Sequence, residues 1–284
     1  MTTIKAFIKS HPVLTYFALT FAISWGAILV VVGPGGLPVT TEQLTMLGLA
    51  TLLGPSVAGI LLTGLASGRV GLRELLSRLL RWRVGARWYA VALLTAPLST
   101  AAVLLALSLL SPEFLPVIFT SDDKATLLLT GIAAGLVVGF FEELGWTGFA
   151  IPRLRLRYSV LTTGLTVGVL WGAWHYLLFW ESDSFSGALP LALLLARLFS
   201  WLPAYRVLMV WVYDRTGSLL VAMLMHVSLV ASTVIVEPPL TGGALLTYIL
   251  VRAAVLWVAI AAVAVANRGQ LERGSSPSSS HRGG

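Results

Sequence analysis

The chain alternates between long apolar runs and short polar connections. Eight of the runs approach or exceed the roughly 20 residues that a helix needs to cross a bilayer, and they cover residues 13–33, 44–66, 88–111, 125–151, 160–180, 188–212, 218–236 and 243–266. The pattern predicts an all-α polytopic membrane protein, a bundle of about eight transmembrane helices. We expect one membrane domain over residues 1–266. The remaining residues, 267–284, are rich in Ser and Gly and predict a disordered cytoplasmic tail.

The composition supports a membrane protein and excludes any chemistry that needs cysteine. Hydrophobic residues make up 57% of the chain and charged residues 11%, with a mean hydropathy of +0.89. Soluble domains usually carry about 25% charged residues. The chain has no cysteine, which excludes disulfides and thiolate metal sites. The net charge is +7, but the basic residues lie between apolar runs and form no basic domain, so we expect no nucleic-acid partner.

The placement of basic residues predicts the orientation in the membrane. Fifteen of the 19 Lys and Arg residues fall in the amino terminus, the tail and loops 67–87, 152–159 and 213–217, which share one side. Lys124 is the only basic residue in the opposite loops. Both termini should therefore be cytoplasmic. The first run is too long for a signal sequence and reaches "GPGG" without a cleavage site, so we expect it to be retained.

Loop 67–87 combines six arginines with leucines at helical spacing. This combination predicts a short amphipathic helix that lies on anionic lipid headgroups.

Four ionisable residues lie deep inside predicted spans: Glu142 and Glu143 in the fourth, His175 in the fifth and His226 in the seventh. A charge at bilayer depth costs roughly 2.5–3.5 kcal/mol on insertion scales. Glu142 and His226 each lie ten residues from the cytoplasmic end of their span, or about 15 Å at the rise of a helix. Because intramembrane ionisable groups face the bundle interior and pair with one another, we predict a shared site.

Two chemistries suit this set of side chains. A carboxylate beside an imidazole can take a proton from water, and a second imidazole can donate a hydrogen bond to an oxyanion. Alternatively, Glu142, His175 and His226 could hold a divalent metal such as zinc. The chain has neither the H-E-x-x-H motif of zinc proteases nor a G-x-G-D aspartyl motif. Alternatively, these residues have a purely structural role. The carboxylates would then pair with an arginine, and the histidines would form hydrogen bonds between helices.

Three ordered motifs resemble those of a known family. They are "EELGWT" at 142–147, "WGAWH" at 171–175 and "HVSLV" at 226–230. Together they are similar to the CAAX prenyl endopeptidase and bacteriocin-processing (CPBP, or Abi) intramembrane proteases. The stretch "YRVLMVWVYDRTGSLLVAMLMH" resembles the bacterial branch of that family. The resemblance implies an intramembrane endopeptidase, of the glutamate type or metal-dependent, in a bacterial cell membrane.

The resemblance also implies roles for individual residues. Glu142 would be the general base and His175 its partner, Glu143 would support them, and His226 would stabilise the oxyanion. No cofactor is certain, and zinc is the candidate metal. We expect membrane lipid as a partner and a peptide or membrane protein as substrate, with or without a lipid attached.

The chain departs from the family motifs at three positions. Thr147 stands where the family has Arg, Trp171 where it has Phe, and Val230 where it has Asn or Asp. We hypothesise that Arg206, in the sixth span, supplies the missing cation. Val230 has no side-chain hydrogen-bond donor, and the absence of one oxyanion donor would lower the rate by a factor on the order of 10²–10³. Weakened activity is therefore one expectation, and a catalytically impaired scaffold or immunity protein of the same fold is the alternative. An ion-coupled transporter is less favoured, because the chain shows no inverted repeat.

Overall fold

The computed structural model describes residues 3–32, 41–267 and 271, and this part of the chain contains helices and turns but no strand. The "GPGG" stretch and almost all of the expected tail lie outside the described residues. The helices are α1 (Thr3–Ser10), α2 (Pro12–Val32), α3 (Thr41–Leu79), α4 (Ala86–Ser108), α5 (Val117–Thr120), α6 (Lys124–Gly145), α7 (Ile151–Arg155), α8 (Val160–Trp174), α9 (Tyr176–Phe179), α10 (Ala188–Phe199), α11 (Leu202–Thr216), α12 (Leu219–Val236) and α13 (Gly242–Ala266), with a 3₁₀ turn at Pro112–Phe114 and a π-helix, η3, at Trp146–Ala150.

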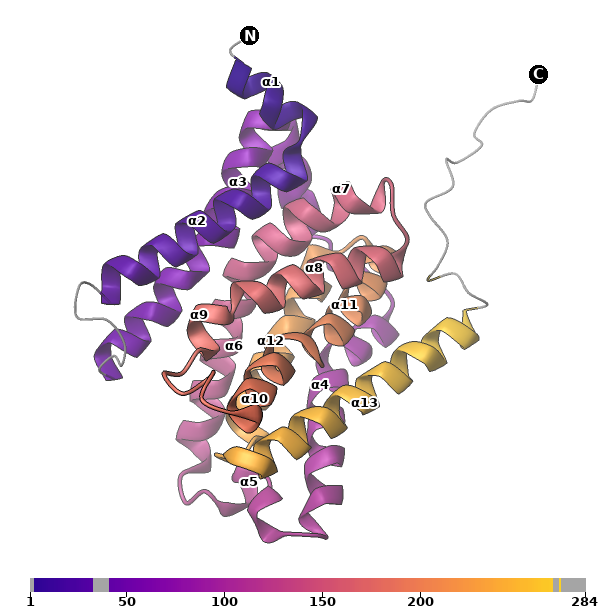
Figure 1. Cartoon of the computed structure of the whole chain (residues 1–284). Coiled ribbons are helices and arrows are strands. Elements are labelled where there is room, and N and C mark those ends of the chain that lie inside the picture. The colour runs from indigo at the N-terminus through magenta and orange to yellow at the C-terminus, as the bar shows by residue number, and fades with distance from the viewer. Residues whose placement is uncertain (1–2, 33–40, 268–270, 272–284) are drawn as a thin grey trace.

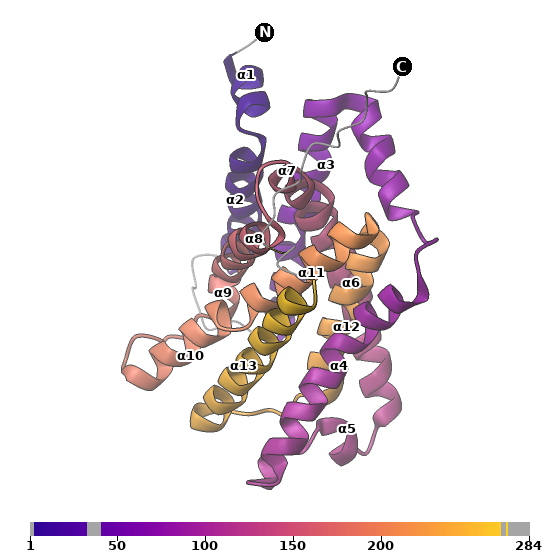
Figure 2. The same ribbon diagram turned by 90° about the vertical axis from the view of Figure 1, so that its right-hand side faces the viewer.

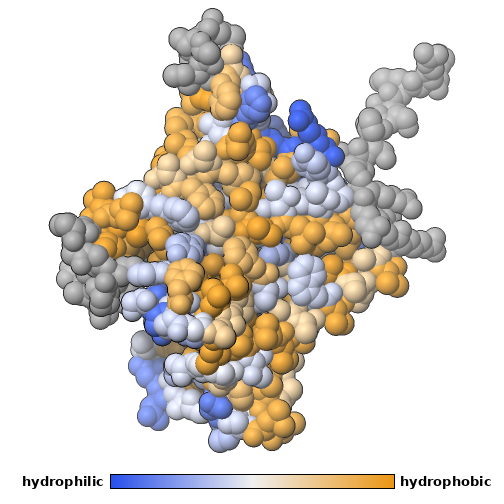
Figure 3. Space-filling view, in the orientation of Figure 1, coloured by the Kyte–Doolittle hydropathy of each residue, from blue (hydrophilic) through white to orange (hydrophobic). Residues whose placement is uncertain are grey.

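The prediction of a polytopic membrane bundle is confirmed. Seven helical segments among the described residues are long and apolar enough to cross a membrane: Pro12–Val32, Met46–Leu79, Ala86–Ser108, Lys124–Arg155, Ala188–Thr216, Leu219–Val236 and Gly242–Ala266. The remaining predicted run, 160–180, contains α8, which is apolar but only 15 residues long. Apolar residues cover most of the face seen in Figure 3, as expected of a surface that meets lipid.

Two predicted spans are interrupted, and one is longer than expected. The run 160–180 breaks at His175, between α8 and α9, and the run 188–212 breaks between α10 and α11. The second span continues past residue 66 through a kink at Gly68, whose φ of 59° is a conformation that glycine adopts readily. Beyond this kink the predicted amphipathic segment is helical as far as Leu79. It buries Leu75 and exposes Leu72 and Leu76.

Three of the helices around the candidate site, α6, α8 and α12, each begin at a side-chain cap. The side chain of Asp123 accepts from the Thr126 N–H (3.0 Å) ahead of α6, and Ser159 and Ser218 cap α8 and α12 in the same way. The hydrogen bonds from Thr126 also hold the pKa of Asp123 below its ordinary value. Gly217, in the left-handed conformation, ends α11 directly before the Ser218 cap, so α12 follows α11 through a short turn.

Glycines bring the site helices into close contact. Along α6, Gly131, Gly135 and Gly139 face α12, and a Cβ on Gly135 would lie 2.6 Å from the carbonyl oxygen of Val227. Along α8, Gly164, Gly168 and Gly172 face α10 and α11 in the same way. Small residues four apart allow backbones to approach in this manner in membrane helices. Figures 1 and 2 show the result, with α6, α8, α11 and α12 gathered at the centre of the bundle, α2 and α3 on one side and α13 across another.

The end of α6 is irregular, and Pro152 helps to explain why. The helix widens into η3 about one turn after the two glutamates. Pro152 has no N–H to offer the carbonyl of Gly148, four residues earlier. Arg78, on the amphipathic part of α3, donates to that carbonyl (3.1 Å) and also to the hydroxyl of Tyr213 (2.9 Å). These two hydrogen bonds hold the amphipathic part of α3 against the end of the helix that carries the carboxylates.

Candidate active site

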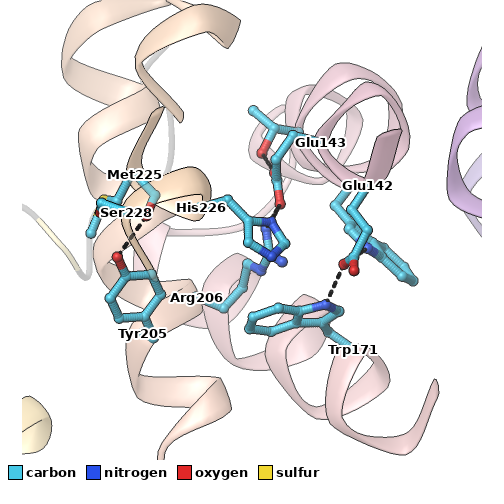
Figure 4. A network of polar contacts seen from close by, with 10 residues as sticks. Glu142, Glu143, Trp171, Tyr205, Arg206, Met225, His226 and Ser228 are labelled. Atoms are coloured by element: carbon cyan, nitrogen blue, oxygen red, sulfur yellow. Dashed lines mark hydrogen bonds and ion pairs between the residues drawn. The ribbon is translucent and has the colours of Figure 1, made fainter. Parts of the chain in front are cut away.

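The two adjacent carboxylates are both buried but make different contacts. Glu142 is 2% exposed and Glu143 is fully buried, one turn before the π-helix. Neighbouring residues on a helix point about 100° apart, so the two side chains leave α6 in different directions. Figure 4 shows Glu143 directed toward His226 and Glu142 directed toward Trp171.

Glu143 is the centre of a buried ion-pair cluster. Its Oε1 accepts from a terminal nitrogen of Arg206 (2.7 Å) and lies 2.7 Å from Nδ1 of His226. Its Oε2 accepts from the hydroxyl of Thr147. Because a carboxylate can only accept, the shared proton of the His226 contact sits on Nδ1, and Nε2 is the ring nitrogen available to other partners. The cluster spans α6, α11, α12 and the π-helix.

Glu142 is held on one oxygen only. The indole N–H groups of Trp171 (2.8 Å) and Trp146 (3.1 Å) both donate to its Oε2. Among the described residues Oε1 receives no protein hydrogen bond, and neither histidine bonds to this carboxylate. Two donors on Oε2 fix the orientation of the carboxylate, while Oε1 keeps its capacity to bind a water or a substrate proton.

His175 stands at the edge of the cluster, where α8 ends. Its Nδ1 lies 2.8 Å from the carbonyl oxygen of Trp171, which can only accept, so Nδ1 carries a proton and Nε2 of the neutral ring keeps its lone pair. The ring is stacked on Phe179 with a centroid separation of 5.4 Å. His175 is half-buried, unlike the other members of the site.

Trp171 joins the two halves of the site. Its ring meets His175 and His226 edge-on, with both centroid separations at 5.3 Å, and the guanidinium carbon of Arg206 lies 4.1 Å from its centroid. The same indole donates to Glu142. A phenylalanine, which the family motif has here, could provide the aromatic face but not the N–H. The side chains of all three motif segments therefore meet around one indole.

The structure brings together most of the residues that were singled out from sequence. Glu142, Glu143, Thr147, Trp171, Arg206 and His226 form one buried group, and His175 touches it through Trp171. The ion pair required by the Arg206 hypothesis is present. Val230 lies one turn beyond His226 and places an apolar side chain there. Trp146 was missed, although its position four residues after Glu142 on the same helix could have signalled the contact.

A metal ligand set does not form in the described part of the chain. No three His, Asp or Glu side chains come together there in a way that would hold an ion. The set predicted from sequence, Glu142 with His175 and His226, is not assembled as a metal site among the described residues, and metal binding stays a prediction.

Comparison with known proteins assigns the central part of the chain. Residues 124–232 match the family model of the type II CAAX prenyl endopeptidase Rce1-like proteins. We call these residues the Rce1-like segment. It begins with α6 and ends within α12, so it contains every residue of the buried cluster. The resemblance to the CAAX protease family is thereby confirmed, whereas the bacterial branch stays a prediction.

A curated relative agrees with the Rce1-like assignment over a shorter stretch. CAAX prenyl protease 2 of Methanococcus maripaludis is 36% identical over 67 residues. The match covers 24% of this chain and 23% of the relative, so the chain spans about a quarter of the length of that protein. The helices before α6 and after α12 lie outside the Rce1-like segment.

Proposed function

We propose that the chain is an intramembrane endopeptidase in which Glu142 activates the hydrolytic water. The observation that carries the proposal is the one-sided anchoring of this carboxylate. Two indoles hold Oε2, and Oε1 is left without a protein donor among the described residues. A general base needs this combination of a fixed position and a free lone pair. Burial among apolar helices removes competing water and strengthens each polar contact.

In the proposed reaction, a water bound at Oε1 of Glu142 attacks the scissile carbonyl carbon. Its proton passes to Glu142, and the carbonyl oxygen becomes an oxyanion. A protonated Nε2 of His226, on the ring edge opposite Glu143, can donate to this oxyanion. When the tetrahedral intermediate breaks down, the proton on Glu142 is transferred to the leaving amine. His175, with its free Nε2, is suited to assist either proton transfer.

Glu143 acts in this scheme as a positioning residue. Its carboxylate binds Nδ1 of His226 and holds Arg206 and Thr147, so the orientation of the imidazole is set by an ion pair that does not itself meet the substrate. A carboxylate behind a histidine fixes the tautomer and the orientation of the ring, as in the Ser-His-Asp triad.

The proposed substrate is a peptide or a membrane-protein segment, with or without a lipid attached, and the proposed location is the cytoplasmic membrane. The relative is named as a prenyl protease, and the same chemistry is extended to this chain because the matched segment contains the whole cluster. The proposed reaction uses only the chain's own side chains for proton transfer, so we expect a chelator to leave the rate unchanged.

The test is cleavage of a peptide library by the detergent-purified chain beside Glu142→Gln. This variant keeps the shape of the side chain and removes the base. We expect the wild type to give products that the variant lacks, with a rate loss on the order of 10²-fold or more. Glu113→Gln is the matched control, since Glu113 is exposed and lies outside the cluster. Identical product profiles from wild type and Glu142→Gln would reject catalysis at this site.

One observation favours the alternative of a non-catalytic scaffold. Val230 offers no donor near His226, so an oxyanion would receive one hydrogen bond fewer than the family motif provides. A scaffold would keep its cellular role when Glu142 and His226 are replaced. The same library experiment, with His226→Gln added, distinguishes a slow enzyme from an inactive protein, because only an enzyme gives products that the variants lack.

A further inference from the structure

A cavity of about 360 Å³ lies where the end of α12 and the start of α13 meet α9 and α10. Figures 1 and 2 show α10 beside the first turns of α13. The wall is mostly apolar and includes Phe179, Trp201, Leu240, Leu245 and Ile249. Such a wall and such a volume are typical of ligand sites, which usually enclose about 300–1,000 Å³. In the expected orientation this end of the bundle faces away from the cytoplasm.

Phe179 connects this cavity to the candidate active site. Its ring lines the cavity and is also stacked on the imidazole of His175, with a centroid separation of 5.4 Å and an interplanar angle of 11°. A smaller cavity of about 220 Å³, between the loop after α9 and α10, is lined by the same phenylalanine. A polypeptide bound in these cavities would therefore lie one ring away from His175.

The cavity and the catalytic residues lie at different depths in the membrane. Thr233 lines the cavity and follows His226 by seven residues on α12, which corresponds to about 10 Å along the helix axis. An extended chain covers this distance in about three residues. A substrate that reaches both places must therefore run along the bundle, from the active site toward the noncytoplasmic end.

The charges in the wall are balanced, which argues against an anionic ligand. Arg197 is bound to Glu181 at 2.7 Å, and Arg252 is bound to Glu237 at 2.5 Å. Because each arginine has a carboxylate partner, the cavity complements a neutral polar group better than a phosphate or a carboxylate.

The ion pair between Arg252 and Glu237 keeps some hydrogen-bonding capacity. One terminal nitrogen of Arg252 donates to Oε1 of Glu237 and to the hydroxyl of Tyr248 (3.2 Å), whereas Nε is buried and has no acceptor among the described residues. Thr233 also donates to Oε1 of Glu237 (3.1 Å), so Oε2 can still accept. A donor and an acceptor in an apolar wall complement the C=O and the N–H of a peptide group.

We propose that this cavity is a subsite for a membrane-spanning substrate, and that it holds an unwound residue on the noncytoplasmic side of the scissile bond. The side chain of that residue would lie against Leu245 and Ile249, and its backbone would bind Arg252 and Glu237. A helix that unwinds in apolar surroundings needs such partners for its freed N–H and C=O groups. This inference rests on the proposed function, and it adds that the substrate is a membrane-embedded segment with an apolar residue about three positions from the cleaved bond.

The test is photo-crosslinking to the detergent-purified full chain in its Glu142→Gln form, so that binding is measured without cleavage. The probes are biotinylated peptides with about 20 apolar residues between lysines, long enough to span a bilayer, each with one photoreactive leucine at a different position. We expect labelling of the wall at Leu240, Leu245 or Ile249. N-methylation of the peptide at the labelling residue should lower labelling roughly tenfold, because the amide donor to Glu237 is removed.

Two substitutions of one wall residue test the fit of the side chain. Leu245→Trp fills the cavity and should lower labelling roughly tenfold or more. Leu245→Ala enlarges it and should shift the preference from photoreactive leucine to photoreactive phenylalanine. Leu250→Trp is the matched control, because Leu250 is 49% exposed on the same helix and does not line the cavity. Should Leu245→Trp fail to fold, Leu245→Ala and the N-methylated peptides still decide the outcome.

Several results would overturn the subsite. It is rejected if Leu250→Trp lowers labelling as much as Leu245→Trp, if N-methylation has no effect, or if phosphatidylcholine displaces the peptides, which would indicate a lipid site. Cleavage by the wild type without labelling of the wall rejects the subsite and leaves the proposed function intact. Labelling of the wall without any cleavage by the wild type supports a polypeptide site and rejects the proposed function.

Discussion

Arg206 is fully buried, with Glu143 on one side of its guanidinium and the face of Trp171 on the other. The two remaining nitrogens, Nε and the second terminal nitrogen, have no acceptor among the described residues. A buried ion pair of this kind contributes little net stability, but breaking it leaves an uncompensated charge. Arg206 therefore sets the charge state of the cluster, and the motif position at Thr147 contributes a hydroxyl instead of a cation.

Replacing Arg206 should destabilise the protein much more than replacing an exposed arginine. Arg206→Met strands the Glu143 carboxylate and should lower the free energy of unfolding by about 3–5 kcal/mol. Arg197→Met is the control, because its partner Glu181 is 61% exposed, and we expect a change of about 1 kcal/mol or less. Denaturant unfolding in a mild detergent measures both.

A second variant tests the reason for that loss. Arg206→Met combined with Glu143→Gln should cost less than Arg206→Met alone, because the stranded charge is gone. If the double variant loses as much as the two single variants added together, the two residues are not coupled and the ion-pair explanation is wrong.

At the scale of the elements, the site depends on how closely helices approach. Glycines on α6 bring it against α12, and glycines on α8 bring it against α11, so the carboxylates, the imidazoles and the arginine come within hydrogen-bond distance. A Cβ on Gly168 would lie 2.5 Å from the Cα of Pro203 and 3.2 Å from the Cβ of Arg206. The spacing between these helices therefore sets the geometry of the site.

Small additions to these helix faces should be disruptive. Gly135→Ala and Gly168→Ala each force backbone to move and should destabilise by about 1–3 kcal/mol, with a fall in Tm. Gly26→Ala on α2 is the matched control, since nothing lies within 4 Å of its added Cβ, and it should be neutral or slightly stabilising. Equal Tm values for all three variants would show that the glycine faces do not limit helix approach.

At the scale of the whole molecule, the ends of the bundle differ in charge. Figure 1 shows α1 and α7, with Lys9, Arg153 and Arg155, toward one end and α5 at the other. Arg78 fastens the basic amphipathic segment to the carbonyl of Gly148 at the first end. The orientation expected from the loop charges places that end in the cytoplasm.

The absence of native cysteine makes this orientation easy to measure. Single cysteines at His11, Ser77 and Asp183, all exposed, give unambiguous labelling sites in a chain that has no other cysteine. A membrane-impermeant maleimide should label Asp183→Cys from outside intact cells, and should label the other two only in inverted vesicles. Labelling of Asp183→Cys and Ser77→Cys from the same side would overturn the topology.

Local patterns in the sequence predict where the helices of this protein lie and which residues form its candidate site. The apolar runs predict where the helices lie, because about 20 apolar residues suit a bilayer and capping residues such as Ser159 and Ser218 mark their starts. The cost of burying charge predicts that Glu142, Glu143, His175 and His226 share one site, and the missing motif cation points to Arg206.

Only the tertiary structure decided how those residues are paired. Runs that are apolar on every side give no helical face to read, so the rotation of each helix follows from glycine contacts with neighbours distant in sequence. That rotation turns Glu143 toward Arg206 and His226, and Glu142 toward the indoles of Trp146 and Trp171.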